Sequence, residues 1–479
     1  MKTVNYLSQS LVLLGITFFS CTNDNSIDQS NQTMIKLSKN EVLSIAYDDA
    51  PELSDNDIFN IVNSFISTED NGVTKSTATS FNITKKTFIN KEGEFENEKS
   101  ATKAVKTDED ITAAICEVEF QHGSETGLAL VAADAKLPSV IALIPNKGSD
   151  FVMEKSGANK LLHASKASYL YKAIKTKELV DSLRQPTLDK ISKELRIPVN
   201  EISYEKIENN ILLTDGIPTT KSTAIQGAPA GVQKDPSSID PIVKTNWGQG
   251  DPYNGQFSIA GKVDRVYNEY GTVVTGPVPV GCVNVAIAQI MGCVYLRIMP
   301  PEFSVPTGGA KFRPNFGAMT AKPYINQVTG SASIDIQNLL LALYIENKTT
   351  SKRDYQAVTD SEVAEEDMLK TMTKYFKCSN RKEAFNGDLA WASLRNGNPV
   401  LMLTDNHAFV LSGILITELA NLSRQLVKTN DVYWYANLGW ADEATGYYQL
   451  DKNANTYFEA GGMKEWSYKM DYINNIRPK

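Results

Sequence analysis

The order of apolar and polar residues divides the chain into stretches that are mainly helical and a later stretch that alternates as strands. Apolar residues recur at helical spacing in five segments, which predicts helices at 55–67, 161–195, 282–296, 336–345 and 362–375. Pro186 falls inside the second segment, and because proline lacks a backbone N–H we expect that helix to break there.

From about residue 400 onward the period of the pattern changes to two. Antiparallel strands are therefore predicted at 400–403, 407–411, 432–436 and 446–450. Upstream, 115–120 alternates in the same way, and 127–133 with 140–144 has the pattern of a short antiparallel pair. Helices followed by strands predict an α+β fold. Residues 414–431 would form an unusually long connector, either a specificity loop or a tolerated insertion.

The length of 479 residues allows two or three domains of ~150 residues each. Residues 211–240 are rich in Pro, Gly, Ser and Thr, which is typical of a linker, and an exposed linker is where proteases cut. A plain connector between domains would have the same composition. We expect this division of the chain: a signal peptide at 1–20, a polar tether leading into a folded segment at 21–112, an α+β domain at 113–210, the linker at 211–240 and a second domain at 241–479.

The first residues have the pattern of a bacterial export signal. Lys2 supplies a positive start, and the apolar run at 11–19 is well short of the ~20 residues that span a bilayer. Cys21 follows a small residue, as in a lipoprotein cleavage site, so we expect it to carry the lipid that anchors the exported protein to a bacterial membrane, at the outer membrane or cell surface. The alternative is a soluble secreted protein in which Cys21 has no such role.

Charge and cysteine content narrow the function classes. The net charge is −8, and no basic stripe is present, so a nucleic-acid partner is not expected. The chain has only three histidines and no close cysteine pair, so neither a zinc site nor another cofactor is predicted. Cys282 and Cys293 would lie ~16 Å apart along one helix, too far for a disulfide. No disulfide framework is expected, and Cys293 and Cys378 are interpreted as buried apolar residues.

Cys282 stands at the start of the most apolar predicted helix. A helix N-terminus carries unpaired N–H groups and partial positive charge, which stabilise a thiolate, and an imidazolium partner would lower its pKa further. His407 begins a predicted strand after a turn, so a Cys–His dyad is possible. Asn437 could orient the imidazole and Trp440 could shield it from water. Judged singly, Cys282 could equally be a core residue, His407 a surface histidine, and 437–440 a turn.

Taken in this order, several segments resemble the streptopain family, a group of papain-like bacterial cysteine peptidases made as zymogens. The segments are 246–254 (NWGQGDPYN), 280–291 (VGCVNVAIAQIM), 391–394 (WASL) with 398–400 (NPV), 407–410 (HAFV), 437–440 (NLGW) and 446–448 (GYY). Weaker similarity at 127–148 is to the strand pair of the family's propeptide. The resemblance implies a papain-like catalytic domain, a helical half plus an antiparallel sheet half, preceded by an α+β propeptide domain.

The resemblance also implies roles for single residues. Cys282 matches the nucleophile, His407 the base, and Trp440 the aromatic residue beside that base. Gly281, Asn406, Leu438 and Gly439 are the expected substrate-binding residues, and Lys221 is one expected processing point. The partners would be protein or peptide substrates, the chain's own propeptide as inhibitor, and a separate proteinaceous inhibitor. The resemblance further implies that the propeptide holds His407 out of its catalytic position.

Three positions depart from the family pattern. Asn406 replaces a Gly, Leu438 a Trp, and Ala441-Asp442 a Gly-Gly pair. These residues are expected to line the cleft, where they would change substrate choice or weaken activity. A catalytically inactive surface binding protein with the same fold is therefore an alternative function. A transglutaminase-like acyl transferase using the same dyad is a third.

Overall fold

The computed structural model describes residues 33–47, 53–69, 78, 80–91, 93–96, 112–134, 136–148, 158–214, 232–268, 270–305, 308–419, 429–450 and 470–479. The predicted signal peptide, Cys21 and Lys221 lie outside these residues. We refer to residues 33–214 as the N-terminal block and to residues 232–479 as the C-terminal part. Among the described residues, no helix is both long and apolar enough to cross a membrane.

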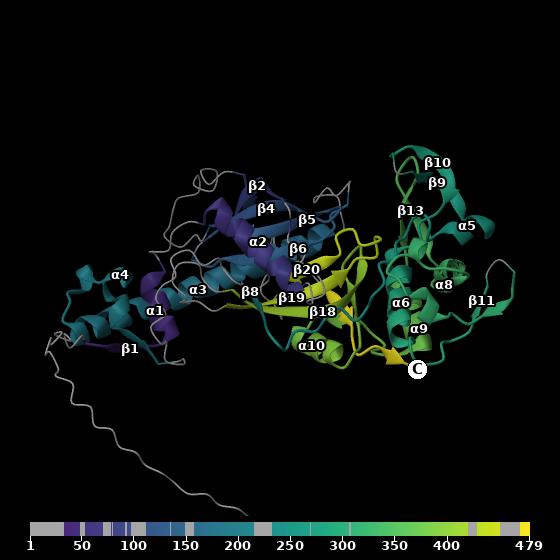
Figure 1. Ribbon diagram of the computed structural model, residues 1–479. Coiled ribbons are helices and arrows are strands. Elements are labelled where there is room, and N and C mark those ends of the chain that lie inside the picture. Colours follow the sequence, from purple (N-terminus) through teal and green to yellow (C-terminus); the bar gives the residue numbers. More distant parts are fainter. Residues whose placement is uncertain are drawn as a thin grey trace, which may run out of the picture.

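One twelve-stranded sheet runs through both parts of the chain (Figure 1). In spatial order its strands are β16 (Glu383–Ala384), β21 (Asp471–Ile473), β17 (Val400–Leu403), β18 (Ala408–Leu419), β19 (Thr429–Asn437), β20 (Gly446–Gln449), β6 (Ser139–Ile144), β5 (Glu125–Ala132), β4 (Ala113–His122), β2 (Ser80–Asn90) and β3 (Gly93–Phe95), with β8 (Val232–Lys234) beside β18. The two parts meet where β6 pairs antiparallel with β20. The N-terminal block and the C-terminal part therefore share a sheet although they are distinct along the chain.

The N-terminal block places a helix on each face of its strands. Its elements outside the sheet are β1 (Ile35–Leu37), α1 (Lys39–Ala46), α2 (Asp55–Glu69), α3 (Ala158–Leu195), α4 (Tyr204–Ile207) and β7 (Ile211–Leu213). Alternate residues of β5 pack toward α3 and toward α2, so this strand is covered on both sides. Within the segment predicted at 21–112, the described residues from 33 onward include two helices and three strands, α1, α2, β1, β2 and β3.

Helix α3 does not break at Pro186 as predicted; it continues for 38 residues. A proline removes one helical hydrogen bond, but tertiary packing supplies most helix stability in proteins. Tyr169 packs into the sheet core before the proline, and Ile191 packs against α1 after it. Packing on both sides of Pro186 therefore keeps the helix continuous.

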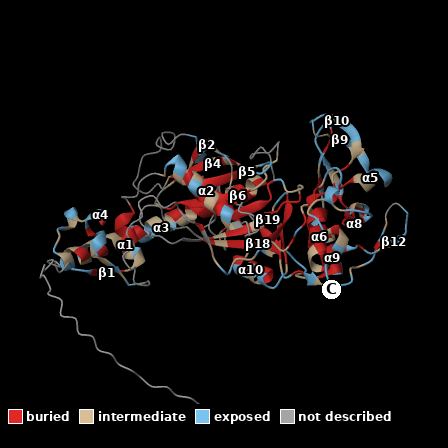
Figure 2. Ribbon diagram, viewed as in Figure 1, coloured by how far each residue is buried: buried red, intermediate tan, exposed pale blue. Residues whose placement is uncertain are grey.

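The C-terminal part has the predicted helical half and sheet half. The helices are α5 (Gly255–Ile259), α6 (Cys282–Val294), α7 (Phe316–Met319), α8 (Ala332–Glu346), α9 (Glu365–Tyr375) and α10 (Gly387–Arg395). A separate four-stranded sheet contains β10 (Val273–Pro277), β9 (Val263–Tyr267), β14 (Val358–Glu362) and β13 (Thr350–Arg353). Short pairs are formed by β11 (Phe303–Ser304) with β12 (Lys311–Phe312) and by β15 (Phe376–Lys377) with β22 (Arg477–Pro478). Helix α6 is buried almost throughout (Figure 2).

Within the predicted long connector at 414–431, the residues that the structure describes are strand. β18 extends to Leu419 and β19 begins at Thr429, and the two pair in register through Ile416 opposite Val432 and Thr417 opposite Asp431. The residues at 420–428 lie outside the described part. The prediction failed because the alternation of apolar residues weakens here, whereas pairing with a long partner strand extends both strands beyond the apolar segments.

Candidate active site

The backbone before α6 requires glycine at position 281. Gly281 has φ +91°, a conformation that side chains with a Cβ rarely adopt, and a Cβ there would lie 3.0 Å from the Cβ of Ser361. The Oγ of Ser361 donates a hydrogen bond to the carbonyl of Pro279 at 2.9 Å. The close approach of Ser361 to Gly281 and the hydrogen bond from Ser361 to Pro279 hold this turn in place. The turn places Cys282 as the first residue of α6.

The thiol of Cys282 faces the first strand residue after His407. Its Sγ accepts a hydrogen bond from the N–H of Ala408 at 3.4 Å, and the residue is only 7% exposed. Burial raises the pKa of Cys282 to about 11, partly opposed by the Ala408 N–H. The intact chain therefore lacks the low pKa expected for an active nucleophile, because burial disfavours the charged thiolate.

The imidazole of His407 is oriented by a backbone carbonyl. Its Nε2 lies 3.0 Å from the oxygen of Leu438. A carbonyl oxygen only accepts, so Nε2 must carry the hydrogen and Nδ1 is left as a proton acceptor. Burial lowers the pKa of His407 to about 4, partly opposed by this hydrogen bond. The ring is thus neutral at pH 7, in the tautomer that a general base requires.

Trp440 lies where the sequence placed it, beside the imidazole. The two ring centroids are 4.6 Å apart at an angle of 35°. Trp440 is partly exposed, whereas His407 is 8% exposed. The indole therefore covers one side of the imidazole.

Cys282 and His407 line the same cavity of about 220 Å³. Val283, Met368 and Leu403 contribute apolar surface, and Asp360, Glu362 and Asn406 contribute polar groups. Within the described residues, no hydrogen bond joins the thiol to the imidazole, since each bonds to a backbone group instead. The structure brings the two predicted residues to one cavity, in a neutral and resting arrangement.

The prediction that Asn437 orients the imidazole is wrong. Its Oδ1 accepts hydrogen bonds from the Nε2 of Gln289 and the N–H of Gly439, both at 3.1 Å. Its Nδ2 donates to the carbonyl of Thr245 at 2.7 Å. With these contacts made, the Asn437 amide has a structural role, and the carbonyl of Leu438 orients His407.

Sequence reasoning missed Gln289. This residue is fully buried seven positions after the nucleophile, and its Oε1 accepts from the hydroxyl of Thr245 and the N–H of Trp247, both at 3.2 Å. It therefore joins α6 to the residues before α5 and to the end of β19. The available signal was a glutamine on the apolar face of a helix, because a buried amide needs partners.

Replacing Gln289 with Leu is expected to lower the free energy of unfolding by about 2–3 kcal/mol, since three buried groups lose their partner. Urea unfolding measures the change. The matched control is Gln356→Leu, at an exposed loop position, which should change stability little. Equal effects of the two substitutions would contradict the structural role of Gln289.

The buried imidazole predicts a specific pH dependence. The folded pKa of His407 is about 4 and the unfolded value is ~6.5, so the unfolded chain binds more protons between these values. The free energy of unfolding of the intact chain should fall by about 3 kcal/mol through this group as pH decreases from ~6.5 to ~4. Urea unfolding of the wild type and of His407→Gln across this pH range measures the change in the free energy of unfolding. The loss should be smaller in the variant, and parallel curves would contradict the assignment.

The predicted substrate-binding residues divide into two groups. Asn406 is exposed and lines the cavity, and Gly281 forms the turn beneath Cys282. Leu438 and Gly439 are buried in the intact chain, with the Leu438 side chain in the sheet core, so their contact with substrate stays a prediction. Asp442 also turns away from the cavity, because its carboxylate accepts from Tyr324 and from Asn146. The departures from the family pattern at 438 and 442 thus serve packing.

The N-terminal block contacts both loops that carry active-site residues. The Nζ of Lys160 on α3 lies 2.8 Å from the Oδ2 of Asp405, two residues before His407. The Nδ2 of Asn146, after β6, donates to the Oδ1 of Asp442 at 3.1 Å, two residues after Trp440. Residues 149–157, which join these two contacts along the chain, lie outside the described part.

None of the four cysteines that the structure describes forms a disulfide bond. Cys116, Cys282, Cys293 and Cys378 are free thiols. Among the described residues, no group of three His, Cys, Asp or Glu side chains is placed to hold a metal ion.

Comparisons with known proteins identify the region around the cavity. Residues 247–448 match the sequence model of the peptidase C10 family. Among solved structures, a fragment of prointerpain A from Prevotella intermedia is similar, with 14% identity and a TM-score of 0.41, over 76% of this chain and 96% of that one. No curated protein sequence matches.

Proposed function

We propose that the chain is a cysteine endopeptidase whose nucleophile is Cys282 and whose base is His407, and the match of residues 247–448 to the peptidase C10 family model supports this. One observation carries the proposal. The two side chains share a cavity in which the Leu438 carbonyl fixes the imidazole tautomer that leaves Nδ1 able to accept a proton. The group that orients the ring is the backbone carbonyl of residue 438, which any residue at that position supplies. Leucine in place of the family's tryptophan at position 438 therefore does not remove the orientation of the imidazole.

The reaction follows from these positions. Nδ1 takes the thiol proton, and the thiolate forms a bond to the carbonyl carbon of the peptide. The imidazolium, held through Nε2 by Leu438, returns a proton to the leaving amine as the C–N bond breaks, which leaves the acyl group on sulfur. Water, deprotonated by the same ring, then releases the acid. The N–H of Cys282, at the helix start, is the donor that stabilises the oxyanion.

The intact chain is proposed to be the inactive zymogen, with the N-terminal block as its intramolecular inhibitor. Burial keeps both the thiol and the imidazole neutral, so the nucleophilic thiolate is scarce. The block holds the loops on either side of the cavity through Lys160 and Asn146. Cleavage within 211–240, for example after Lys221, is the proposed first step of activation. A separate inhibitor protein would be the other regulatory partner.

Export and lipid anchoring through Cys21 are part of the same proposal, and they are supported by the short apolar run that precedes this residue. Metabolic labelling with palmitate should mark the wild-type protein, and Cys21→Ser should lose the label and enter the soluble fraction. A labelled variant would contradict the anchor.

Thiol labelling tests the proposed activity. After activation, dilute iodoacetamide at mildly acidic pH should modify Cys282 stoichiometrically, because ordinary thiols barely react there. The intact chain should react far more slowly. Absence of labelling after activation would favour the alternative of an inactive binding protein.

Product analysis separates hydrolysis from acyl transfer. With an added primary amine, a peptidase should still release mainly free carboxylate, whereas predominant amide product would indicate the transglutaminase-like alternative.

A further inference from the structure

We infer that the N-terminal block stays bound to the C-terminal part after the chain is cut between them, so that cleavage of the linker alone does not release the peptidase. This inference concerns binding, and it holds whether or not the chain hydrolyses peptides. Three features of the boundary carry it: the shared sheet, the shared apolar cores and a buried polar cluster.

The first feature is a strand pair at the middle of the twelve-stranded sheet. β6 of the N-terminal block and β20 of the C-terminal part pair through Leu143 opposite Tyr447 and Ala142 opposite Tyr448. Every residue of both strands is buried. A Cβ at Gly446 would lie 2.2 Å from the oxygen of Leu143, so β20 carries a glycine where the backbone of the block approaches most closely. The boundary between the block and the C-terminal part is therefore an interior strand pair of the sheet, and neither strand is an exposed sheet edge.

The second feature is that both faces of this sheet are covered jointly. On one face Phe65 of α2 packs edge-on against Tyr433, with ring centroids 4.8 Å apart. On the other face Tyr169 and Leu170 of α3 belong to the same core as Trp434. Loss of the block would expose these aromatic side chains to water, at ~25 cal/mol for each Å² of apolar surface.

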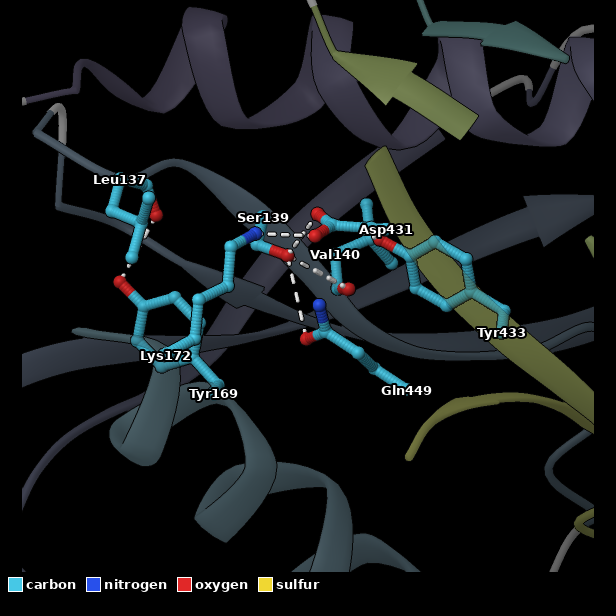
Figure 3. Close-up of polar contacts among 8 residues, drawn as sticks. All are labelled: Leu137, Ser139, Val140, Tyr169, Lys172, Asp431, Tyr433 and Gln449. Carbon is cyan, nitrogen blue, oxygen red and sulfur yellow. Dashed lines mark hydrogen bonds and ion pairs between the residues drawn. The ribbon is translucent and has the colours of Figure 1, made fainter. Parts of the chain in front are cut away.

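The third feature is a polar cluster to which both parts contribute side chains (Figure 3). Asp431 of β19 is 3% exposed. Its carboxylate pairs with the Nζ of Lys172 on α3 and accepts from the hydroxyl of Ser139 on β6 at 2.8 Å. The hydroxyl of Tyr433 lies 3.4 Å from the same carboxylate. Departure of the block would take away the cation and the Ser139 hydroxyl together.

The ion pair beside the active site is exposed, whereas the ion pair at Asp431 is buried. Asp405, the partner of Lys160, is 74% exposed, and exposed ion pairs contribute little to binding. Removing one partner of a buried pair is costly, because the other charge is left without compensation. Attachment therefore rests on the sheet and the Asp431 cluster, whereas the restraint near His407 is weaker. Removal of the block requires further cleavage within the block itself.

The experiment uses the full chain with Cys282→Ala, which prevents self-digestion, and a recognition sequence for a specific protease placed within 215–231. After complete cutting, size-exclusion chromatography with light scattering should show one species that contains both fragments and has the mass of the uncut chain. Two separate folded fragments would overturn the inference.

Charge variants identify what holds the complex. Lys172→Met should raise the dissociation constant of the cut complex by about tenfold or more, measured by dilution with a label on the block. The matched control is Lys175→Met on the same helix, whose pair with Glu178 is exposed, and it should change little. Equal behaviour of the two variants would overturn the role of the cluster. Melting of each uncut variant verifies folding, and Ser139→Ala replaces Lys172→Met if that chain does not fold, with the same expected direction.

Discussion

Replacing Cys282 with Ala is expected to reduce peptide hydrolysis by on the order of 10⁴-fold or more and to stop self-cleavage of the chain. Alanine removes the sulfur that forms the acyl intermediate, whereas the fold loses the hydrogen bond from Ala408 and keeps a small apolar side chain at this position. Release of a peptide fluorophore measures activity, and gel analysis of purified protein measures self-cleavage. The substitution should leave the thermal unfolding midpoint nearly unchanged.

The matched control for this prediction is another thiol on the same helix. Cys293 lies near the end of α6, and its Sγ contacts the carbonyl of Ile242 at 3.6 Å, away from the cavity. Cys293→Ala should keep most of the activity and all of the self-cleavage. If Cys282→Ala matures normally in purified form, self-processing through this thiol is wrong.

Replacing His407 with Ala is expected to lower peptide hydrolysis by about 10³-fold, which is within the range for loss of a general base. The thiol would then lose the group that accepts its proton, although Sγ remains in the cavity. The value of kcat/KM for a peptide substrate measures the effect, and kcat should fall much more than KM rises.

The histidine control is His163 on α3, outside the cavity beside Cys282. His163→Ala should retain activity after activation. Comparable losses in the two variants would mean that the His407 effect reflects folding instead of proton transfer.

The residues nearest the chemistry were accessible from sequence because their neighbours are locally distinctive. The apolar spacing after Gly281 predicts α6 close to its observed bounds. The alternation around His407 predicts where β18 begins, although the strand continues to Leu419, well beyond the predicted end at Leu411. The α+β arrangement of a helical half and a sheet half was also confirmed. These features depend on short-range patterns, which a single sequence carries.

Contacts between distant segments were not accessible in the same way. The sequence identified 437–440 as part of the site, but only the fold shows that the carbonyl of Leu438 holds the imidazole while the Asn437 side chain bonds to Gln289. A backbone carbonyl has no signature in the sequence. The pairing of β6 with β20 is similarly hidden, because the alternation of each strand is compatible with many partners.

The most direct test of the account is the pH dependence of Cys282 alkylation in activated wild-type protein and in activated His407→Ala. If the two side chains form a dyad, the wild-type rate should stay high well below pH 8, because the imidazolium stabilises the thiolate. The variant should instead follow the ionisation of an isolated thiol, at pH ~8.5 or above. Superimposable profiles would show that the imidazole does not act on the sulfur and would contradict the proposed dyad.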